Sequence, residues 1–177
     1  HIGESLLKTL PGDGLEPEEH HLATHFLKRP QRDVLIEIYK RLRPGDPGSY
    51  TMSLDDAWEK LRVRHDQPLT EVHVVNGLHP DLPFEYYLDL LRGFKRIRPE
   101  IHLKCFTAVE IAFFADLYGK SDEEVLRELM EAGLASLPGG GAEVFAERVR
   151  RKICHDKADA DRWLSIHRTA HRLGMKS

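Results

Sequence analysis

Hydrophobic and polar residues follow two kinds of pattern along the chain. Short apolar runs, several of them rich in β-branched residues, are typical of strands, and longer segments with apolar residues at i, i+3 and i+4 are typical of amphipathic helices. The two kinds alternate through most of the sequence. The predicted strands are Val34–Ile38, Glu71–Val75, Ile101–Phe106 and Ala135–Leu137, with Met175–Ser177 as the beginning of a fifth.

Capping residues mark the starts of the predicted helices. Thr107 with Glu110, and Ser121 with Glu124, have the spacing of capping boxes, in which each side chain bonds the backbone N–H of the other residue. Pro83 suits the first turn of a helix, because proline lacks the N–H that this turn leaves unpaired. The predicted helices cover residues 53–61, 83–98, 108–117, 121–132, 143–151 and 158–173.

The alternation of strands and helices predicts the fold class. Strand–helix units at this spacing form right-handed βαβ crossovers and therefore a parallel sheet. An eight-fold barrel takes ~250 residues, and an open doubly wound sheet normally completes its last strand. Because the sequence stops where a strand should begin, we expect residues 33–177 to be part of a larger α/β barrel. Residues 1–32, with a predicted helix over Glu18–Lys28, form a helical lead-in.

Composition and charge narrow the range of functions. The chain has 177 residues, the length of one domain, and no apolar run near the ~20 residues of a membrane span. Its net charge of −3 provides no field to hold a nucleic acid. Two cysteines, Cys105 and Cys154, suit a reducing compartment, and residues 1–5 carry no export signal. We therefore expect a cytoplasmic protein that binds neither membranes nor nucleic acids.

The loops after the predicted strands are the candidate functional site, because ligands of parallel α/β folds bind at the carboxyl ends of strands. These loops are Asn76–Pro80, Thr107–Glu110 and Pro138–Glu143. The three glycines of residues 139–141 predict an anion-binding concavity of backbone amides, with a flexible turn as the alternative. Neither a P-loop nor G-x-G-x-x-G is present there, which argues against a nucleotide triphosphatase and a dinucleotide dehydrogenase.

Several polar side chains near these loops have two interpretations. His79 is a candidate polar contact or proton donor, or else a solvated turn residue. Glu110 and Glu143 lie at predicted helix starts, where the helix dipole favours a carboxylate for structural reasons alone. His167 and His171 are four residues apart, but their helix is strongly charged and lacks H-E-x-x-H, so we expect a solvated face.

A basic run precedes the last predicted helix. Such a run either pairs with a substrate carboxylate or faces water, and the second is usual. We therefore expect this run to be solvated. Its members are Arg148, Arg150, Arg151, Lys152 and Lys157.

The loops together resemble a known family, the aminofutalosine synthases, which are radical S-adenosylmethionine enzymes of the futalosine route to menaquinone. The resemblance covers nearly everything from about Pro44 to the end of the chain. It is carried by Gly45–Leu54, Asn76–Tyr87, Lys104–Ile111, Ser136–Phe145, Arg150–Ala158 and Trp163–Met175.

The resemblance implies a barrel with a [4Fe-4S] cluster that cleaves S-adenosylmethionine. The 5′-deoxyadenosyl radical adds to 3-[(1-carboxyvinyl)oxy]benzoate, and rearrangement with decarboxylation gives aminofutalosine. It also implies a small-molecule substrate and an electron donor such as flavodoxin or ferredoxin. The implied cofactor-binding residues are Asn76, at a position where glycine is commoner, Gly77, Gly139, Gly140, Gly141 and Glu143, and the implied substrate-binding residues are His79, Thr107 and Glu110.

The cluster ligands are the main departure from the family. The family binds its cluster with a Cys-x-x-x-Cys-x-x-Cys loop between the first strand and the Gly-Asp-Pro-Gly segment, whereas here Ile38–Leu42 crosses that interval. Cluster iron needs closely spaced thiolates, which Cys105 and Cys154 do not provide. We therefore expect the cluster cysteines in a segment missing between Ile38 and Gly45, and the chain to cover roughly the first half of the barrel.

Other functions stay open. Cyclic dehypoxanthinyl futalosine synthase and FO synthase share the Gly-Leu-His-Pro segment, but Phe106–Ile111 and the Arg-Arg-Lys-Ile-Cys stretch favour aminofutalosine synthase. From another class, a paralogue without a cluster would bind S-adenosylmethionine or a nucleoside without chemistry. A barrel enzyme of sugar-phosphate type is a third interpretation, which rests only on the glycine amides at a helix start.

Overall fold

The structure, a computed structural model, describes residues 33–37, 39–40, 50–153 and 157–177. The predicted helical lead-in of residues 1–32 and the interval that holds the expected cluster loop lie outside these ranges. The described residues belong to one compact unit. Its helices are α3 (Leu54–Arg62), α4 (Phe84–Ile97), α5 (Ala108–Tyr118), α6 (Asp122–Ala132), α7 (Glu147–Ile153) and α8 (Ala160–Arg172).

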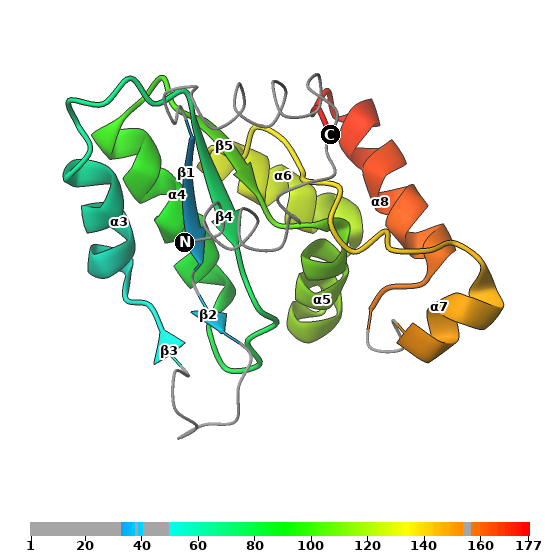
Figure 1. Ribbon diagram of the computed structural model, residues 1–177. Coiled ribbons are helices and arrows are strands. Elements are labelled where there is room, and N and C mark those ends of the chain that lie inside the picture. Colours follow the sequence, from blue (N-terminus) through cyan, green and yellow to red (C-terminus); the bar gives the residue numbers. More distant parts are fainter. Residues whose placement is uncertain (1–32, 38, 41–49, 154–156) are drawn as a thin grey trace, which may run out of the picture. The chain divides into compact units, whose positions relative to one another are not determined.

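A parallel sheet forms the centre of this unit (Figure 1). Its strands β1 (Asp33–Glu37), β4 (Glu71–Val75) and β5 (His102–Cys105) lie in the order β1-β4-β5. The short strands β2 (Tyr39–Lys40) and β3 (Tyr50–Thr51) pair with each other in antiparallel fashion. The prediction of an α/β fold with parallel strands is confirmed.

The two later predicted strands contribute single bridges in place of full ladders. Ser136 forms a parallel bridge with Lys104 of β5 and another with Lys176. The chain thus passes beside β5 at Ser136 and then beside Ser136 at Lys176, both times in the same direction as the sheet. The predicted strand at residues 135–137 and the predicted strand beginning at residue 175 lie where these bridges form.

Both capping boxes are confirmed. The Thr107 N–H donates to Glu110 Oε2 at 2.7 Å, and the Glu110 N–H donates to Thr107 Oγ1 at 3.4 Å. The Ser121 N–H likewise donates to Glu124 Oε2 at 2.8 Å, and the Glu124 N–H to Ser121 Oγ at 3.2 Å. These bonds satisfy backbone donors that a helix start leaves unpaired, so α5 and α6 begin where the sequence predicts.

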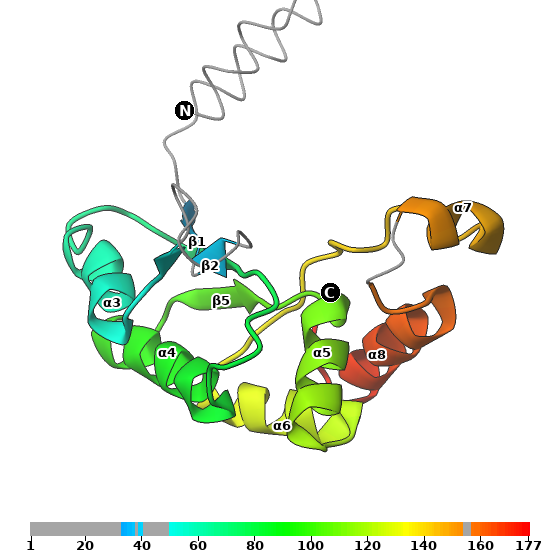
Figure 2. The ribbon, with the colours of Figure 1, turned by 90° about the horizontal axis from the view of Figure 1, so that it is seen from below.

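The hydrophobic core lies between the sheet and an arc of helices. Figure 2 shows α3, α4, α6, α5 and α8 following one another around one side of the sheet. Phe114 is at the centre of an aromatic cluster, with ring centroids 4.5 Å from Tyr87, 5.5 Å from Phe106 and 5.8 Å from Phe84. All four rings are buried, so this cluster fixes α4 and α5 against the end of β5.

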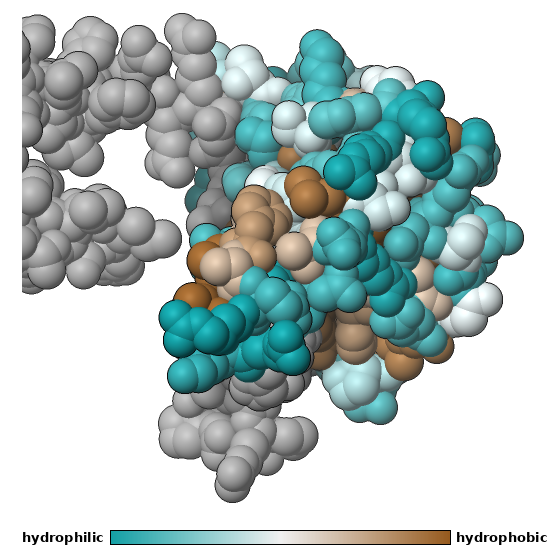
Figure 3. All heavy atoms as spheres, turned by 90° about the vertical axis from the view of Figure 1, so that its right-hand side faces the viewer, coloured by the Kyte–Doolittle hydropathy of each residue, from teal (hydrophilic) through white to brown (hydrophobic). Residues whose placement is uncertain are grey.

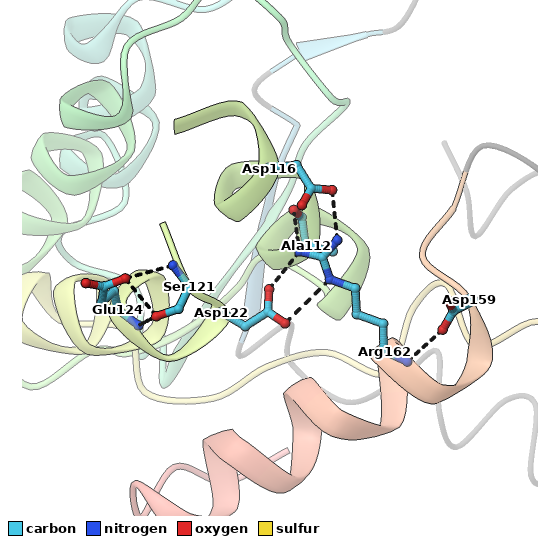
Figure 4. Close-up of polar contacts among 7 residues, drawn as sticks. All are labelled: Ala112, Asp116, Ser121, Asp122, Glu124, Asp159 and Arg162. Carbon is cyan, nitrogen blue, oxygen red and sulfur yellow. Dashed lines mark hydrogen bonds and ion pairs between the residues drawn. The ribbon is translucent and has the colours of Figure 1, made fainter. Parts of the chain in front are cut away.

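Arg162 attaches α8 to α5 and α6 (Figure 4). Its guanidinium contacts Asp116 Oδ2 at 2.8 Å and Asp122 Oδ1 at 3.0 Å, and it donates to the Ala112 carbonyl at 3.2 Å. The two carboxylates raise the pKa of Arg162 above its usual value. Asp159 caps the same helix by accepting the Arg162 N–H at 2.7 Å. Side chains on α8 are therefore held at a defined distance from α5.

The predicted helix over residues 143–151 was wrong at its start. Glu143 has a φ of 49°, in the left-handed region that no right-handed helix contains. The helix α7 begins four residues later, at Glu147. Glu143 therefore lies in a loop, and the helix-dipole explanation for its carboxylate does not apply.

The close contact between Gly93 and Trp58 gives a test of the packing between α3 and α4. A Cβ at position 93 would lie 2.0 Å from Trp58 Nε1, which already donates to the Leu90 carbonyl at 3.2 Å. We expect Gly93→Ala to lower the free energy of unfolding by about 1–3 kcal/mol, although alanine favours a helix by about 1 kcal/mol.

Urea unfolding followed by circular dichroism measures this change, with Gly139→Ala as the control. A Cβ at position 139 meets no atom within 4 Å, so the control should keep the wild-type stability within about 0.5 kcal/mol. A Gly93→Ala variant as stable as the wild type would show that the indole is free to move aside.

Candidate functional site

The loops that follow β4, β5 and Ser136 meet at the carboxyl edge of the sheet. Residues 139–144, here called the glycine loop, pack directly on the start of α5. A Cβ on Gly140 would lie 2.9 Å from Thr107 Cγ2, and one on Gly141 would lie 2.4 Å from Val109 Cγ2. Leu78, from the loop after β4, and Val109 line the same cavity of about 320 Å³. All three predicted loops therefore contribute residues to one region.

Phe106 turns the chain sharply from β5 into α5. Its φ of 57° lies in the left-handed region, which is rare for residues other than glycine and costs on the order of 1–3 kcal/mol. Its ring is fully buried in the aromatic cluster, which holds the residue in this conformation. The turn places Thr107 and Glu110 immediately beyond the strand, at the edge where ligands bind in such folds.

Glu110 is a buried carboxyl group with one unpartnered oxygen. Its side chain is 4% exposed, and its Oε2 accepts the Thr107 N–H at 2.7 Å and the Thr107 hydroxyl at 2.8 Å. Its Oε1 is buried and has no hydrogen bond within the described part of the chain. Burial raises the pKa of Glu110 to about 7, although the bonds from Thr107 oppose the shift. This carboxyl group therefore exchanges a proton near neutral pH, unlike an ordinary helix cap.

The glycine loop has a row of unused backbone donors. The Trp163 Nε1–H donates to the Gly140 carbonyl at 3.2 Å, and Gly141 has a φ of 83°. Within the described residues, the N–H groups of residues 139–144 donate no hydrogen bond. Successive free N–H groups beside a left-handed residue are typical of concavities that bind anions and other acceptors. Ligand binding by this loop stays a prediction.

His79 is fixed in the loop after β4. Its Nδ1 accepts the Asp81 N–H at 3.1 Å, and its Nε2 lies 3.1 Å from Thr51 Oγ1. Because Nδ1 accepts, the neutral ring carries its proton on Nε2 and donates it to Thr51. The ring is half-buried and connects this loop to β3, so its role extends beyond that of a solvated turn residue.

Asn76 and Gly77 directly follow β4, and both are half-buried. Burial raises the pKa of Tyr87, and the nearby Asn76 side chain opposes this rise. The phenol therefore stays protonated at neutral pH. The Asn76 amide therefore lies between the core and the edge that the three loops share.

Glu143 is exposed and paired with a base. Its Oε1 lies 2.6 Å from Lys157 Nζ, and this ion pair lowers the pKa of Glu143. Lys157 is therefore exposed to solvent, as predicted, and also forms an ion pair with Glu143. Contact between Glu143 and a cofactor stays a prediction.

The expectation that the whole basic run faces water was wrong for Arg150, which is 3% exposed. Arg148, Arg151 and Lys152 are exposed as predicted. Figure 3 shows that most of the face carrying α7 and α8 is hydrophilic, with a patch of hydrophobic residues among the polar ones. Phe145 and Val149 are large hydrophobic residues that stay exposed in this part of the chain. Among the described residues, no helix is long and apolar enough to cross a membrane.

The expectation of a solvated histidine face was wrong for His167 and correct for His171. His167 is 8% exposed, and its ring lies 4.0 Å from the Trp163 ring between centroids. Burial lowers the pKa of His167, and His171 lowers it further. The packing of α8 on α5 and α6 covers His167, which the charged sequence of the helix did not indicate.

Polar side chains line one face of the sheet, opposite to the face that carries the buried side chains of β4 and β5. In β4 and β5 the buried Val72, Val74, Leu103 and Cys105 alternate with half-buried polar residues. Lys104 Nζ lies 2.9 Å from Glu71 Oε1, and His102 Nε2 lies 2.7 Å from Ser136 Oγ. This polar face was not predicted from the sequence, although the alternation in residues 71–75 and 102–105 was its signal.

The cysteines do not fit a [4Fe-4S] cluster. A cluster needs several closely spaced thiolates, and the sequence contains only Cys105 and Cys154. Cys105 is fully buried, and this burial raises the pKa of its thiol well above the usual range. In the described ranges, no group of three histidine, cysteine, aspartate or glutamate residues is placed to hold a metal ion.

The chain is similar in sequence to several named enzymes. It is 47% identical to the aminodeoxyfutalosine synthase of Thermus thermophilus over 133 residues, which are 75% of this chain and 36% of that protein. It is 44% identical to the aminodeoxyfutalosine synthase of Streptomyces coelicolor over 135 residues, 76% of this chain and 35% of that protein. It is also 36% identical to the cyclic dehypoxanthine futalosine synthase of Halalkalibacterium halodurans over 132 residues, 75% of this chain and 36% of that protein.

These similarities confirm the resemblance that the loop sequences indicated. The chain spans about a third of the length of the curated relatives it matches. Identity to the two aminodeoxyfutalosine synthases exceeds identity to the cyclic dehypoxanthine futalosine synthase, as the Phe106–Ile111 segment predicts. No family model matches the chain.

The raised pKa of Glu110 makes stability depend on pH. The pKa is 4.5 in the reference state and about 7 in the folded chain, so the folded chain keeps its proton at higher pH. The free energy of unfolding should therefore fall as the pH rises from about 4.5 to about 7, by at most about 3 kcal/mol. Glu110→Gln keeps the cap but cannot ionise, and urea unfolding between about pH 5 and pH 8 should show a smaller loss of stability.

Glu124→Gln is the matched control, because Glu124 occupies the same position in the second capping box but is exposed. Hydrogen bonds from Ser121 lower the pKa of Glu124, so its stabilising effect is lost only as the pH falls through that pKa, below 4.5. This variant should show the wild-type profile above pH 5. Identical profiles for Glu110→Gln and the wild type would contradict the assignment.

Proposed function

We propose that this chain is part of an aminodeoxyfutalosine synthase, a radical S-adenosylmethionine enzyme of menaquinone biosynthesis with a (β/α) barrel. Such an enzyme joins the 5′-deoxyadenosyl group of S-adenosylmethionine to 3-[(1-carboxyvinyl)oxy]benzoate, and after rearrangement and decarboxylation gives aminofutalosine, with methionine and carbon dioxide as the other products. The observation that carries the proposal is the identity of 47% and 44% to two aminodeoxyfutalosine synthases over three quarters of the chain. The site geometry supports it, because the three loops of the family resemblance meet at one edge of the sheet.

The glycine loop and Asn76–Gly77 are proposed to hold the cofactor. When bound, S-adenosylmethionine supplies the 5′-deoxyadenosyl group. The unused N–H groups of residues 139–143 would donate to acceptor atoms of the nucleoside, and the backbone carbonyls of Asn76 and Gly77 would accept from the methionyl ammonium group. None of these backbone contacts depends on a side-chain charge, which suits a loop of three glycines.

Glu110, Thr107 and His79 are proposed to face the substrate. The unpartnered Oε1 of Glu110 would bond a substrate hydroxyl or carboxyl group, and its pKa near 7 allows it to accept or donate a proton there. The His79 Nε2–H and the Thr107 hydroxyl would supply further polar contacts. In the structure both already bond within the protein, so each keeps a fixed direction before the substrate arrives.

A second candidate function follows from the cysteines. With two thiols in the sequence, one of them buried, the chain as given has no set of ligands for a [4Fe-4S] cluster. A protein with the same loops and no cluster would bind S-adenosylmethionine or a nucleoside without transforming it. Binding and turnover therefore have to be measured separately.

Calorimetric titration of the purified chain with S-adenosylmethionine tests the binding site. We expect saturable binding that Gly141→Ala weakens, because its Cβ would meet Val109 and its φ of 83° disfavours alanine. Inorganic phosphate should give no comparable heat. Thermal stabilisation by phosphate but not by S-adenosylmethionine would favour the sugar-phosphate interpretation.

The reaction is tested by anaerobic incubation of the chain with iron, sulfide, dithionite, S-adenosylmethionine and 3-[(1-carboxyvinyl)oxy]benzoate. Aminofutalosine detected by mass spectrometry, with iron bound to the protein, would support the synthase. Binding of S-adenosylmethionine without iron or product would favour the second candidate. A chain that binds neither S-adenosylmethionine nor 5′-deoxyadenosine would contradict both.

A further inference from the structure

Arg150 is a buried cation that the glycine loop surrounds. Its side chain is 3% exposed, whereas Arg148 and Arg151 on the same helix are exposed. The guanidinium forms no ion pair with a carboxylate of the described residues. A buried charge without an ionic partner is costly unless hydrogen bonds replace the lost water, so the bonds that Arg150 makes are the reason it lies there.

Four backbone carbonyls take the place of a counter-ion. The Arg150 Nη1 donates to the carbonyls of Ala142 at 2.5 Å and Val144 at 3.1 Å. Its Nη2 donates to the carbonyls of Gly141 at 3.1 Å and Ala158 at 2.5 Å. Three of the acceptors belong to the glycine loop, and the fourth lies in the segment that leads into α8. The planar guanidinium thus fixes the directions of both segments at once.

The orientation of these carbonyls determines the orientation of the loop N–H groups. In a trans peptide unit the C=O of one residue and the N–H of the next point in opposite directions. Carbonyls of Gly141 and Ala142 that point at Arg150 therefore turn the N–H groups of Ala142 and Glu143 away from it. These are among the N–H groups that donate no hydrogen bond to described residues.

We propose that Arg150 is a positioning residue for the proposed nucleoside site. It does not touch the ligand, but it holds the glycine loop in the conformation that presents free N–H groups to acceptor atoms of the ligand. The positive φ values of Gly141 and Glu143 belong to this conformation, and the four hydrogen bonds offset the strain at Glu143. The inference rests on the proposed function, because it assigns the ligand of the loop as a nucleoside.

Three variants on α7 test the role, with 5′-deoxyadenosine as the probe in calorimetric titration of the whole chain. Arg150→Ala should weaken binding roughly 10-fold or more, since supporting residues of this kind typically contribute that much. Arg150→Lys keeps the charge but lacks the planar fork, so its affinity should lie between those of Arg150→Ala and the wild type. Arg148→Ala, which removes an exposed arginine of the same helix, should bind like the wild type.

Two readouts separate positioning from general destabilisation. Added guanidinium ion at millimolar concentration should restore part of the affinity of Arg150→Ala and should leave Arg148→Ala unchanged. Limited proteolysis of the ligand-free chain should cut Arg150→Ala faster between residues 139 and 158, with the cleavage rate elsewhere unchanged. A variant that is only less stable would be cut faster throughout and would not respond to guanidinium.

The outcomes distinguish the two proposals. Wild-type affinity in Arg150→Ala would overturn the positioning role and leave the proposed function standing. Absence of nucleoside binding by the wild type would overturn the proposed function and, with it, the assignment of the loop to a nucleoside. If the wild type binds no nucleoside, faster cleavage of Arg150→Ala would still show that Arg150 fixes the conformation of the glycine loop. Equal cleavage of the variant and the wild type would overturn this structural role too.

Discussion

The three hydrogen bonds between Glu110 and Thr107 form the contact on which the other parts of the site depend. They fix the first turn of α5 directly after the strained residue at the end of β5. The glycine loop packs on that turn through Val109, and Arg162 bonds the same helix further along and so fixes α8. Trp163 of α8 in turn donates a hydrogen bond to the glycine loop. Displacement of this first turn would therefore disturb every loop of the proposed site.

Three ionisable groups near this edge are accommodated in three different ways. Arg162 is only partly buried and is neutralised by two aspartates, an arrangement that serves packing. Arg150 is buried and bonded to neutral carbonyls, and its positive charge contributes to the lowered pKa of Glu143 in the same loop. Glu110 is buried with one free oxygen and a pKa near 7. In the proposed site, Arg150 would fix the backbone donors of the glycine loop, and Glu110 would supply a carboxyl group that loses its charge easily.

Sequence analysis predicted the parts of the fold that depend on local rules. The Thr-x-x-Glu and Ser-x-x-Glu patterns gave two helix starts correctly, because a capping box is satisfied within one turn. The left-handed conformation of Glu143 and the burial of Arg150 and His167 were not predicted. Each of these features depends on packing against segments that are distant in the sequence. The polar face of β4 and β5 could have been predicted, because the alternation of polar and apolar residues over 71–75 is visible in the sequence and indicates a strand with one polar face. The cluster cysteines are a further difference, because the sequence itself departs from the family there.

In the proposed function, the loops after β4, after β5 and after Ser136 form one nucleoside site. Backbone amide chemical shifts of the ¹⁵N-labelled chain, recorded during titration with 5′-deoxyadenosine, test it most directly. We expect saturable shifts at Gly77, at Glu110 and at Gly140 and Gly141, all with a single dissociation constant. Unchanged amides in these three loops at a ligand concentration that shifts residues elsewhere would contradict the claim.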